Sequence, residues 1–213
     1  MNVFTKQDVA ANYDQYYQTE IGKKVSQIEE NLFNDLLTNI PKTDMLELGC
    51  GTGQWTEYFI NKGFKLTGID VSDEMLKFAH SKNLNADFIN ADSSQIPFDD
   101  NSFSTVSSIT MLEFVEDQNT VLQEAYRVLK PGGWLILGCL NANSELGKNR
   151  KNDEVFGKAN FLNPEKLNQK LHAFSNLKMN FGVYFSPTFE ILDGNSEIEV
   201  EPAFIAILAQ KKI

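Results

Sequence analysis

The chain has 213 residues, of which 42% are hydrophobic and 23% charged, and this suits a single globular domain with its own core. It carries 19 Lys and Arg against 29 Asp and Glu, a formal net charge of −10 at pH 7. Because this excess of negative charge repels polyanions, nucleic acid is not expected as a partner.

Two further features bear on the cellular compartment. Residues 1–18 mix Asn, Lys, Asp and Gln without the apolar segment of a signal peptide, and the longest apolar stretch, 134–140, is far too short to span a bilayer. Cys50 and Cys139 are the only cysteines, too few for a disulfide framework. We therefore expect a cytoplasmic protein with reduced thiols and no membrane span.

Apolar residues first recur at helical spacing in residues 25–36, where Val25, Ile28, Leu32 and Leu36 fall on one face. The pattern predicts an amphipathic helix that ends before Pro41. The residues ahead of it predict an irregular N-terminal segment.

The most informative stretch is residues 45–55. Residues 45–48 read as a short buried strand, and a helix with an apolar face begins at Gln54. Between them, glycine stands at every second position, at Gly49, Gly51 and Gly53. Since glycine permits positive backbone torsions and close approach of a ligand, the pattern predicts a turn that cradles a nucleoside-bearing molecule.

The next predicted strand, 64–69, ends at Asp70. Ligands of parallel α/β sheets bind at the carboxyl ends of the strands, and a carboxylate there can accept two hydrogen bonds from a ribose diol. The alternative is that Asp70 only opens the helix whose N-cap is Ser72.

Strands and helices alternate through the rest of the chain. Helices are predicted at 73–81, 117–130 and 163–174, and strands at 86–90, 103–109, 134–139, 177–186 and 203–210. The sequence Pro-Gly-Gly at 131–133 is expected to stop the second of these helices. Such alternation predicts an α/β fold with a mostly parallel sheet and helices on both faces.

Three motifs together resemble those of class I S-adenosylmethionine-dependent methyltransferases. They are Glu-Leu-Gly-Cys-Gly-Thr-Gly at 47–53, Gly-Ile-Asp-Val-Ser at 68–72 and Tyr-Arg-Val-Leu-Lys-Pro-Gly-Gly at 126–133. The match covers roughly residues 40–140 and is most similar to the small-molecule branch that includes quinone-biosynthesis methyltransferases.

The resemblance implies a Rossmann-like, doubly wound sheet of seven strands whose last strand is antiparallel. It further implies one methyltransferase domain over residues 1–213, with S-adenosylmethionine as cofactor, S-adenosylhomocysteine as product and no metal. Within that domain we expect an N-terminal lid and helix at 1–40, a cofactor-binding core at 41–140, a substrate-side insertion at 141–162 and a C-terminal helix with strands at 163–213.

The competing interpretation is a nicotinamide or flavin fold. Its fingerprint is Gly-x-Gly-x-x-Gly, with the pyrophosphate on a helix N-terminus. Here the third glycine comes one residue early, and Glu47 places a negative charge beside the loop. A carboxylate suits a cationic sulfonium and ammonium better than a diphosphate.

The expected cofactor site extends beyond the glycine turn. Glu47 is expected to bind the methionyl ammonium, and the resemblance implies that Asp92 contacts the adenine amino group, while the next backbone N–H, that of Ser93, can donate to the ring. Asp92 as a turn cap and Met75 as a core residue are the alternatives. The full expected set is Glu47, Gly49, Gly51, Thr52, Gly53, Asp70, Val71, Met75, Asp92, Ser93, Thr110, Tyr13 and Tyr16.

The two tyrosines of that set, Tyr13 and Tyr16, belong to the N-terminal segment, which the resemblance implies covers the cofactor. The alternative is that they are aromatic anchors that hold a lid in place. The two histidines, His80 and His172, are expected to be structural rather than metal ligands.

The predicted reaction is in-line transfer of the sulfonium methyl group to a small molecule, with no general base nominated. The acceptor is expected between the N-terminal segment and residues 141–162, in a pocket that Phe156, Phe161, Tyr184 and Phe185 could line. Glu113 could orient it, although a solvated side chain is the simpler interpretation. The alternative function is a catalytically silent regulator that binds S-adenosylmethionine or S-adenosylhomocysteine.

Overall fold

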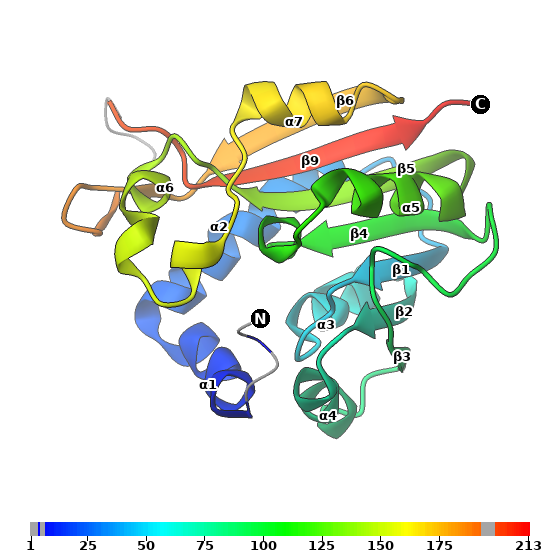
Figure 1. The fold of residues 1–213 in the computed structure, drawn as a ribbon, viewed down its shortest axis with the longest axis horizontal. Helices are drawn as coiled ribbons and strands as arrows, with labels where there is room; N and C mark the ends of the chain where they lie inside the picture. The colour runs from blue at the N-terminus through cyan, green and yellow to red at the C-terminus, as the bar shows by residue number, and fades with distance from the viewer. Residues whose placement is uncertain (1–3, 5–6, 193–198) are drawn as a thin grey trace.

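The computed structural model describes residues 4, 7–192 and 199–213. Its centre is a seven-stranded sheet with the order β3-β2-β1-β4-β5-β9-β6 (Figure 1). The strands are β1 (Asp44–Leu48), β2 (Lys65–Asp70), β3 (Ala86–Asn90), β4 (Phe103–Ile109), β5 (Leu129–Leu140), β6 (Phe174–Gly182) and β9 (Phe204–Lys211).

Strands β1 to β5 pair in parallel, whereas β9 runs antiparallel to both of its neighbours, β5 and β6. The structure thus confirms the prediction of a mostly parallel sheet with an antiparallel final strand. A separate two-stranded ribbon joins β7 (Tyr184–Phe185) to β8 (Ile191–Leu192).

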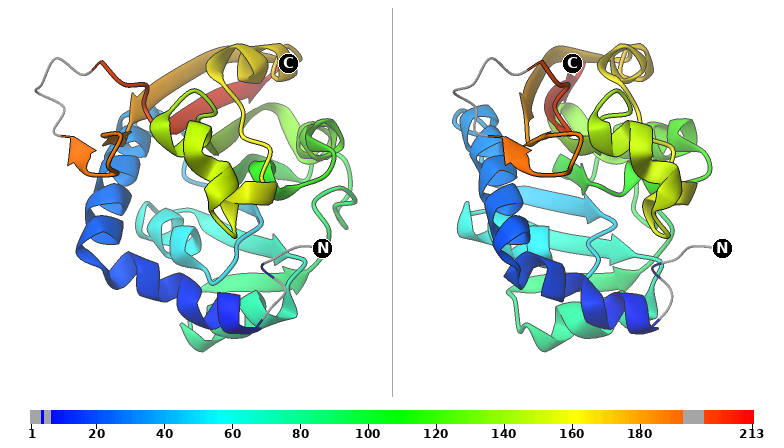
Figure 2. Two further views of the ribbon diagram at one scale, coloured as in Figure 1. Left: turned by 60° about the vertical axis from the view of Figure 1, so that its left-hand side comes forward. Right: turned by 90° about the vertical axis from the view of Figure 1, so that its left-hand side faces the viewer.

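Helices cover both faces of the sheet, as alternating strands and helices predict. One face carries α2 (Glu20–Leu36) and α3 (Gln54–Asn61), whose residues Phe33, Trp55 and Phe59 share a core with Phe204 of β9. The other face carries α5 (Gln118–Val128) and α7 (Pro164–Lys170). The right-hand view of Figure 2 shows these two layers of helices on either side of the sheet.

Side-chain caps explain where several of these helices begin. Helix α4 (Asp73–Ser81) follows Ser72, whose hydroxyl oxygen accepts a hydrogen bond from the Met75 N–H, and it packs against β2 and β3. Asn163 caps α7 in the same way through the Lys166 N–H. Because these signals are local, the bounds of α4 agree with the prediction from sequence.

Shorter helical elements are α6 (Glu145–Asn149), η2 (Leu112–Phe114), η3 (Arg150–Asn152) and η4 (Phe156–Lys158).

The predicted irregular N-terminal segment is wrong, because residues 7–18 form the helix α1 (Gln7–Gln18). This helix packs against α2 and α4 (Figure 1). The chain turns sharply between α1 and α2, and the turn requires Gly22, since a Cβ there would lie 1.9 Å from the Tyr16 carbonyl oxygen. Asp14 then holds α1 in place through an ion pair with Lys82 at 2.8 Å.

Two predicted boundaries around the Pro-Gly-Gly sequence are also wrong. Helix α5 ends at Val128 rather than 130, and β5 begins at Leu129 rather than 134. The reason is pairing across the sheet, because Leu129 lies opposite Phe103 of β4 and the register then shifts so that Trp134 lies opposite Thr105. Similarly, α7 ends at Lys170, since β6 already pairs with β9 from Phe174 onward.

Candidate active site

The glycine turn after β1 has the conformation that its spacing predicts. Gly49, Gly51 and Gly53 have φ angles of +69°, +54° and +82°. The Gly49 N–H donates to the Ile69 carbonyl oxygen at 2.8 Å, which ties the turn to the end of β2. A Cβ on Gly51 would meet no atom within 4 Å, so this residue faces open space. The turn therefore leaves room for a ligand to approach its backbone.

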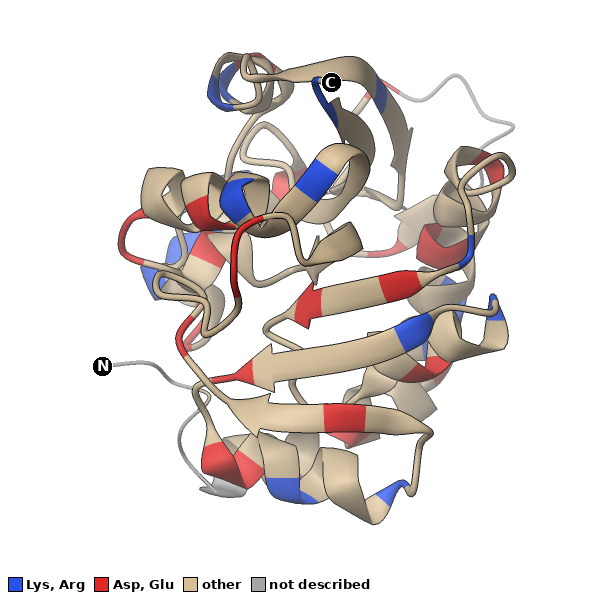
Figure 3. Ribbon diagram, turned by 90° about the vertical axis from the view of Figure 1, so that its right-hand side faces the viewer, with Lys and Arg blue, Asp and Glu red and all other residues tan. Residues whose placement is uncertain are grey.

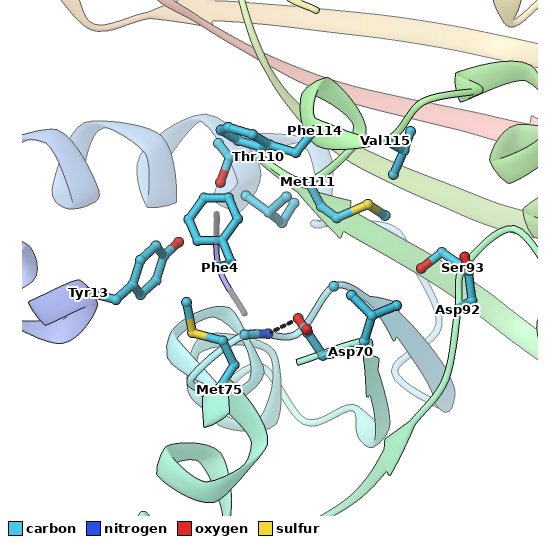
Figure 4. Close-up of a pocket in the computed structure, with 14 residues that line it drawn as sticks. Phe4, Tyr13, Asp70, Met75, Asp92, Ser93, Thr110, Met111, Phe114 and Val115 are labelled. Carbon is cyan, nitrogen blue, oxygen red and sulfur yellow. Dashed lines mark hydrogen bonds between the residues drawn. The ribbon is translucent and has the colours of Figure 1, made fainter. Parts of the chain in front are cut away.

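Asp70, at the end of β2, fixes the same turn from the other side. Its Oδ2 accepts a hydrogen bond from the Gly51 N–H at 2.9 Å (Figure 4). Its Oδ1 accepts one from the Ser72 N–H at 2.8 Å. Burial raises the pKa of the carboxyl, and these hydrogen bonds oppose that shift. Because a carboxylate offers about four lone-pair positions, Asp70 retains acceptor capacity for hydroxyl groups.

A cavity of about 100 Å³ lies in front of this turn. Five of its lining residues are outside the set of cofactor residues expected from the sequence: Phe4, Ile109, Met111, Phe114 and Val115. Four of these lie at or just beyond the end of β4, next to Thr110, and the strand end was a signal that could have found them. Nine of the thirteen expected cofactor residues line it, namely Tyr13, Gly49, Gly51, Asp70, Val71, Met75, Asp92, Ser93 and Thr110.

The other four expected residues lie elsewhere. Glu47 is 2% exposed beneath the turn, where its Oε2 accepts a hydrogen bond from the Thr56 hydroxyl, and burial raises its pKa to about 8. The Thr52 hydroxyl donates to Asp14, which joins the turn to α1, and Gly53 is the N-cap of α3. Tyr16 lines a second cavity. These four are outside the wall of the first cavity.

Asp92 and Ser93 line one end of the first cavity, and Tyr13 lines the end opposite them (Figure 4). The Asp92 Oδ1 accepts a hydrogen bond from the Ser94 N–H at 2.7 Å, so Asp92 caps a turn while it lines the cavity. Met75 is 2% exposed, and it too combines core packing with a place in the cavity wall. The alternatives drawn from the sequence for these two residues are thus compatible with the expected site.

The second, larger cavity of about 650 Å³ adjoins the first. Phe4, Tyr13, Thr110 and Phe114 line both cavities. The rest of the wall is mostly aromatic and aliphatic and comes from α1, α2, residues 140–156 and the last third of the chain. Of the residues expected in an acceptor pocket, Phe156 and Phe185 line it, whereas Phe161 and Tyr184 do not.

The prediction that Glu113 is solvated is wrong. Its side chain is 1% exposed, because η2 folds beneath the end of β5 and the Leu140 N–H donates to its Oε1. Burial raises the pKa of Glu113 to about 7. Glu113 therefore supports the backbone where β5 ends and does not line either cavity.

The charge around the first cavity bears on which kind of nucleotide cofactor suits it better. Its described lining residues include the carboxylates of Asp70 and Asp92 and no Lys, Arg or His. Figure 3 shows acidic residues at the arrowheads of two central strands, the edge at which the cavity lies. A diphosphate would lack a basic partner there, whereas a nucleoside that carries a positive charge fits.

Two further features of the described part of the chain concern membranes and metals. No helix within it has the length and hydropathy needed to cross a bilayer. Nor do its His, Cys, Asp and Glu side chains gather in groups of three or more that could hold a metal ion. Both cysteines are free and buried.

Comparison with known proteins gives consistent similarities. Residues 46–137 match the family model described as a methyltransferase domain. The chain is 34% identical to an uncharacterised protein of Methanocaldococcus jannaschii over 99% of this chain and 100% of that protein. It is also 36% identical to the demethylmenaquinone methyltransferase of Staphylococcus aureus, over 47% of this chain but only 44% of that enzyme.

A solved structure from Thermotoga maritima, described as an S-adenosylmethionine-dependent methyltransferase and possible histamine N-methyltransferase, has the same fold. It superposes with a TM-score of 0.76 at 24% identity and covers 97% of this chain and 98% of its own.

Proposed function

Because the chain belongs to the class I S-adenosylmethionine-dependent methyltransferases, we propose that it transfers a methyl group from S-adenosylmethionine to a small molecule held in the second cavity. The observation that carries this proposal is the contact between the two cavities. They share Phe4, Tyr13, Thr110 and Phe114, so a cofactor in the first would meet an acceptor in the second at this wall.

In the first cavity, we assign the ribose hydroxyls to the free lone pairs of Asp70 and the adenine to the wall near Asp92, Ser93 and Val71. The open side of Gly51 would accommodate the methionyl end. Glu47 supports the same turn from below and adds negative charge when it is ionised. Tyr13 and Tyr16 on α1 would close the site. Thr52 would act as part of the turn, through its contact with Asp14, and Gly53 as the N-cap of α3.

When bound, S-adenosylmethionine supplies an electrophilic methyl group on a positively charged sulfur. The residues around the shared wall would align the acceptor and exclude water, and Thr110, directly after β4, is one of the residues that line both cavities. Alignment alone supplies roughly 7–11 kcal/mol in well-oriented model reactions, so no general base is required by this proposal.

The small size of the acceptor is supported by the dimensions and chemistry of the second cavity. A space of about 650 Å³ with mostly apolar walls suits a small organic molecule rather than a nucleic acid. Two similar proteins are described as a demethylmenaquinone methyltransferase and a possible histamine N-methyltransferase, and both names refer to small molecules.

Calorimetry with S-adenosylmethionine and S-adenosylhomocysteine tests the first half of the proposal, and a labelled-methyl screen on metabolite extracts tests the second. Binding of both nucleosides, together with label in a small metabolite, is the expected result. Binding without any transfer would favour a catalytically silent regulator. Absence of binding would contradict the proposal altogether.

A further inference from the structure

The second cavity contains a buried carboxylate that the fold does not explain. Glu29, on α2, lines the cavity and is 7% exposed. Each of the two other buried glutamates of the described chain has a partner for one carboxylate oxygen: Glu47 accepts from the Thr56 hydroxyl, and Glu113 from the Leu140 N–H, although the Glu113 Oε2 has none. No hydrogen bond or ion pair connects Glu29 to another residue that the structure describes. A buried acid without a partner is costly, so its presence at a cavity wall points to a ligand.

The surroundings of Glu29 are aromatic and carry no positive charge. Tyr13, Tyr16 and Tyr17 of α1 line the same cavity; burial raises the pKa of all three, and the charge of Glu29 adds to that rise. The described lining residues include no Lys, Arg or His. Asp153 is the only other acid among them, and it is exposed and engaged in hydrogen bonds from the Val155 and Phe156 N–H groups.

We propose that the second cavity takes an amine with an apolar or aromatic body, and that its ammonium group binds between the Glu29 carboxylate and the tyrosine rings. This inference rests on the proposed function and deepens it by naming the acceptor class. A carboxylate and the faces of aromatic rings both attract a cation, and both interactions strengthen when water is excluded. The net charge of −10 favours the approach of a cation, whereas an acidic acceptor would meet Glu29 and Asp153 without any basic partner.

The protonation of Glu29 gives the inference a second readout. Burial raises its pKa to about 8, with a smaller contribution from Glu30 on the same helix. The tyrosines that face it from α1 stay neutral below that pH because their pKa values are raised too, and Asp153 lies at the exposed edge. An ammonium ligand must therefore displace a proton from Glu29 near neutral pH, so its apparent affinity should rise between about pH 6 and pH 8.5.

Three probes of the same shape test the amine class. We would titrate the full chain, with and without saturating S-adenosylhomocysteine, with 2-phenylethylamine, 2-phenylethanol and phenylacetate. The amine should bind more tightly than the alcohol by on the order of tenfold or more, the factor expected of a hydrogen bond to a charged group, and phenylacetate should bind most weakly. The preference should increase with pH over the range given above.

Glu29→Gln should remove the preference for the amine and its pH dependence while the alcohol binds as before. Glutamine has nearly the same shape, and thermal unfolding checks that the variant folds. The matched control is Glu20→Gln, because Glu20 is an exposed acid on the same helix that does not line the cavity. This control should leave all three affinities unchanged.

Equal affinity for amine and alcohol would overturn the inference. So would a preference for the amine that survives Glu29→Gln, or a failure of the amine to bind to protein that binds S-adenosylhomocysteine. Failure of the proposed function would look different. The preference for the amine would persist, but the nucleoside would not bind or no metabolite would receive label.

Discussion

Asp70 accepts a hydrogen bond from the Gly51 N–H at 2.9 Å, and this contact joins the end of β2 to the turn after β1 across 19 residues of sequence. The same carboxylate also accepts from the Ser72 N–H at the start of α4. One side chain therefore fixes the shape of the cofactor turn and presents its remaining lone pairs to the first cavity.

Asp70→Ala should weaken binding of S-adenosylhomocysteine by on the order of 1–3 kcal/mol, or about 5- to 150-fold. The variant loses both the ribose acceptor and the bond that holds Gly51. Calorimetry measures the change. Asp87→Ala is the matched control, since Asp87 is an exposed aspartate on the neighbouring strand β3 and does not line the cavity. An unchanged dissociation constant for Asp70→Ala would refute its assignment.

Alanine at Gly51 and at Gly49 should give different results. At Gly51 the new methyl group points into open space, so Gly51→Ala should cost about 1–2 kcal/mol of stability for its left-handed backbone and block the cofactor. At Gly49 the methyl group would lie 2.3 Å from the Met111 Cγ, so this variant should lose considerably more stability. Urea unfolding and nucleoside titration on both proteins separate the effects. Full nucleoside affinity in Gly51→Ala would show that the ligand does not approach this turn.

Asp14→Ala should release α1 from the cofactor turn. Asp14 accepts from the Thr52 hydroxyl and pairs with Lys82, and both contacts are lost in the variant. The partly exposed ion pair contributes about 1 kcal/mol at most, and the buried Thr52 hydroxyl left without its acceptor costs about 1–3 kcal/mol more in overall stability. Hydrogen exchange should also become faster in residues 7–18, and nucleoside affinity should fall several-fold. Unaltered exchange in this helix would mean that Asp14 does not anchor it.

The unliganded protein should lose stability as the pH rises from about 5 to about 8. Burial raises the folded-state pKa values of Glu29, Glu47 and Glu113 to about 8, 8 and 7, above their ordinary value of 4.5. Between these limits the native state keeps protons that the unfolded state releases, so the free energy of unfolding falls as pH rises. The loss is complete once the pH passes the folded-state values.

Urea unfolding at pH 5, 6.5 and 8 measures this slope. Glu113→Gln should make the slope shallower. Each proton that the native state keeps and the unfolded state releases makes the free energy of unfolding fall by roughly 1.4 kcal/mol per pH unit, and the variant has one such proton fewer. Glu154→Gln, at an exposed acid in the 141–162 segment, is the control and should reproduce the slope of the unmodified protein. A free energy of unfolding that rises steadily over this pH range would contradict the assigned protonation states.

Much of the sheet could be predicted because its signals are local. The local backbone conformation follows from nearby residues at the Ser72 cap, at the glycines of the turn and in the predicted strand 103–109. The structure accordingly places β3, β4 and α4 where the sequence predicted them. The errors occur where distant residues decide. Leu129 is extended because it pairs with Phe103. Glu113 is buried because its carboxylate accepts a hydrogen bond from the Leu140 N–H, a partner 27 residues away in the sequence.

The first cavity could be anticipated for the same reason, since strand ends and glycines mark it in the sequence. The second was anticipated only in part, since Phe156 and Phe185 were expected in an acceptor pocket and do line it. The rest of its wall could not be predicted, because α1, α2 and the segment near Phe204 come together only in the folded chain. Glu29 illustrates the difference. In the sequence it is one acid of an amphipathic helix, and only the packing of α1 against α2 encloses it among tyrosines.

A crystal structure of the full chain with S-adenosylhomocysteine tests the central claim most directly. We predict that the ribose hydroxyls lie on the Asp70 carboxylate, that the homocysteine end lies along the Gly51 backbone, and that the sulfur faces the wall formed by Tyr13 and Thr110. A nucleoside bound away from Asp70, or with its sulfur turned from the second cavity, would contradict this arrangement.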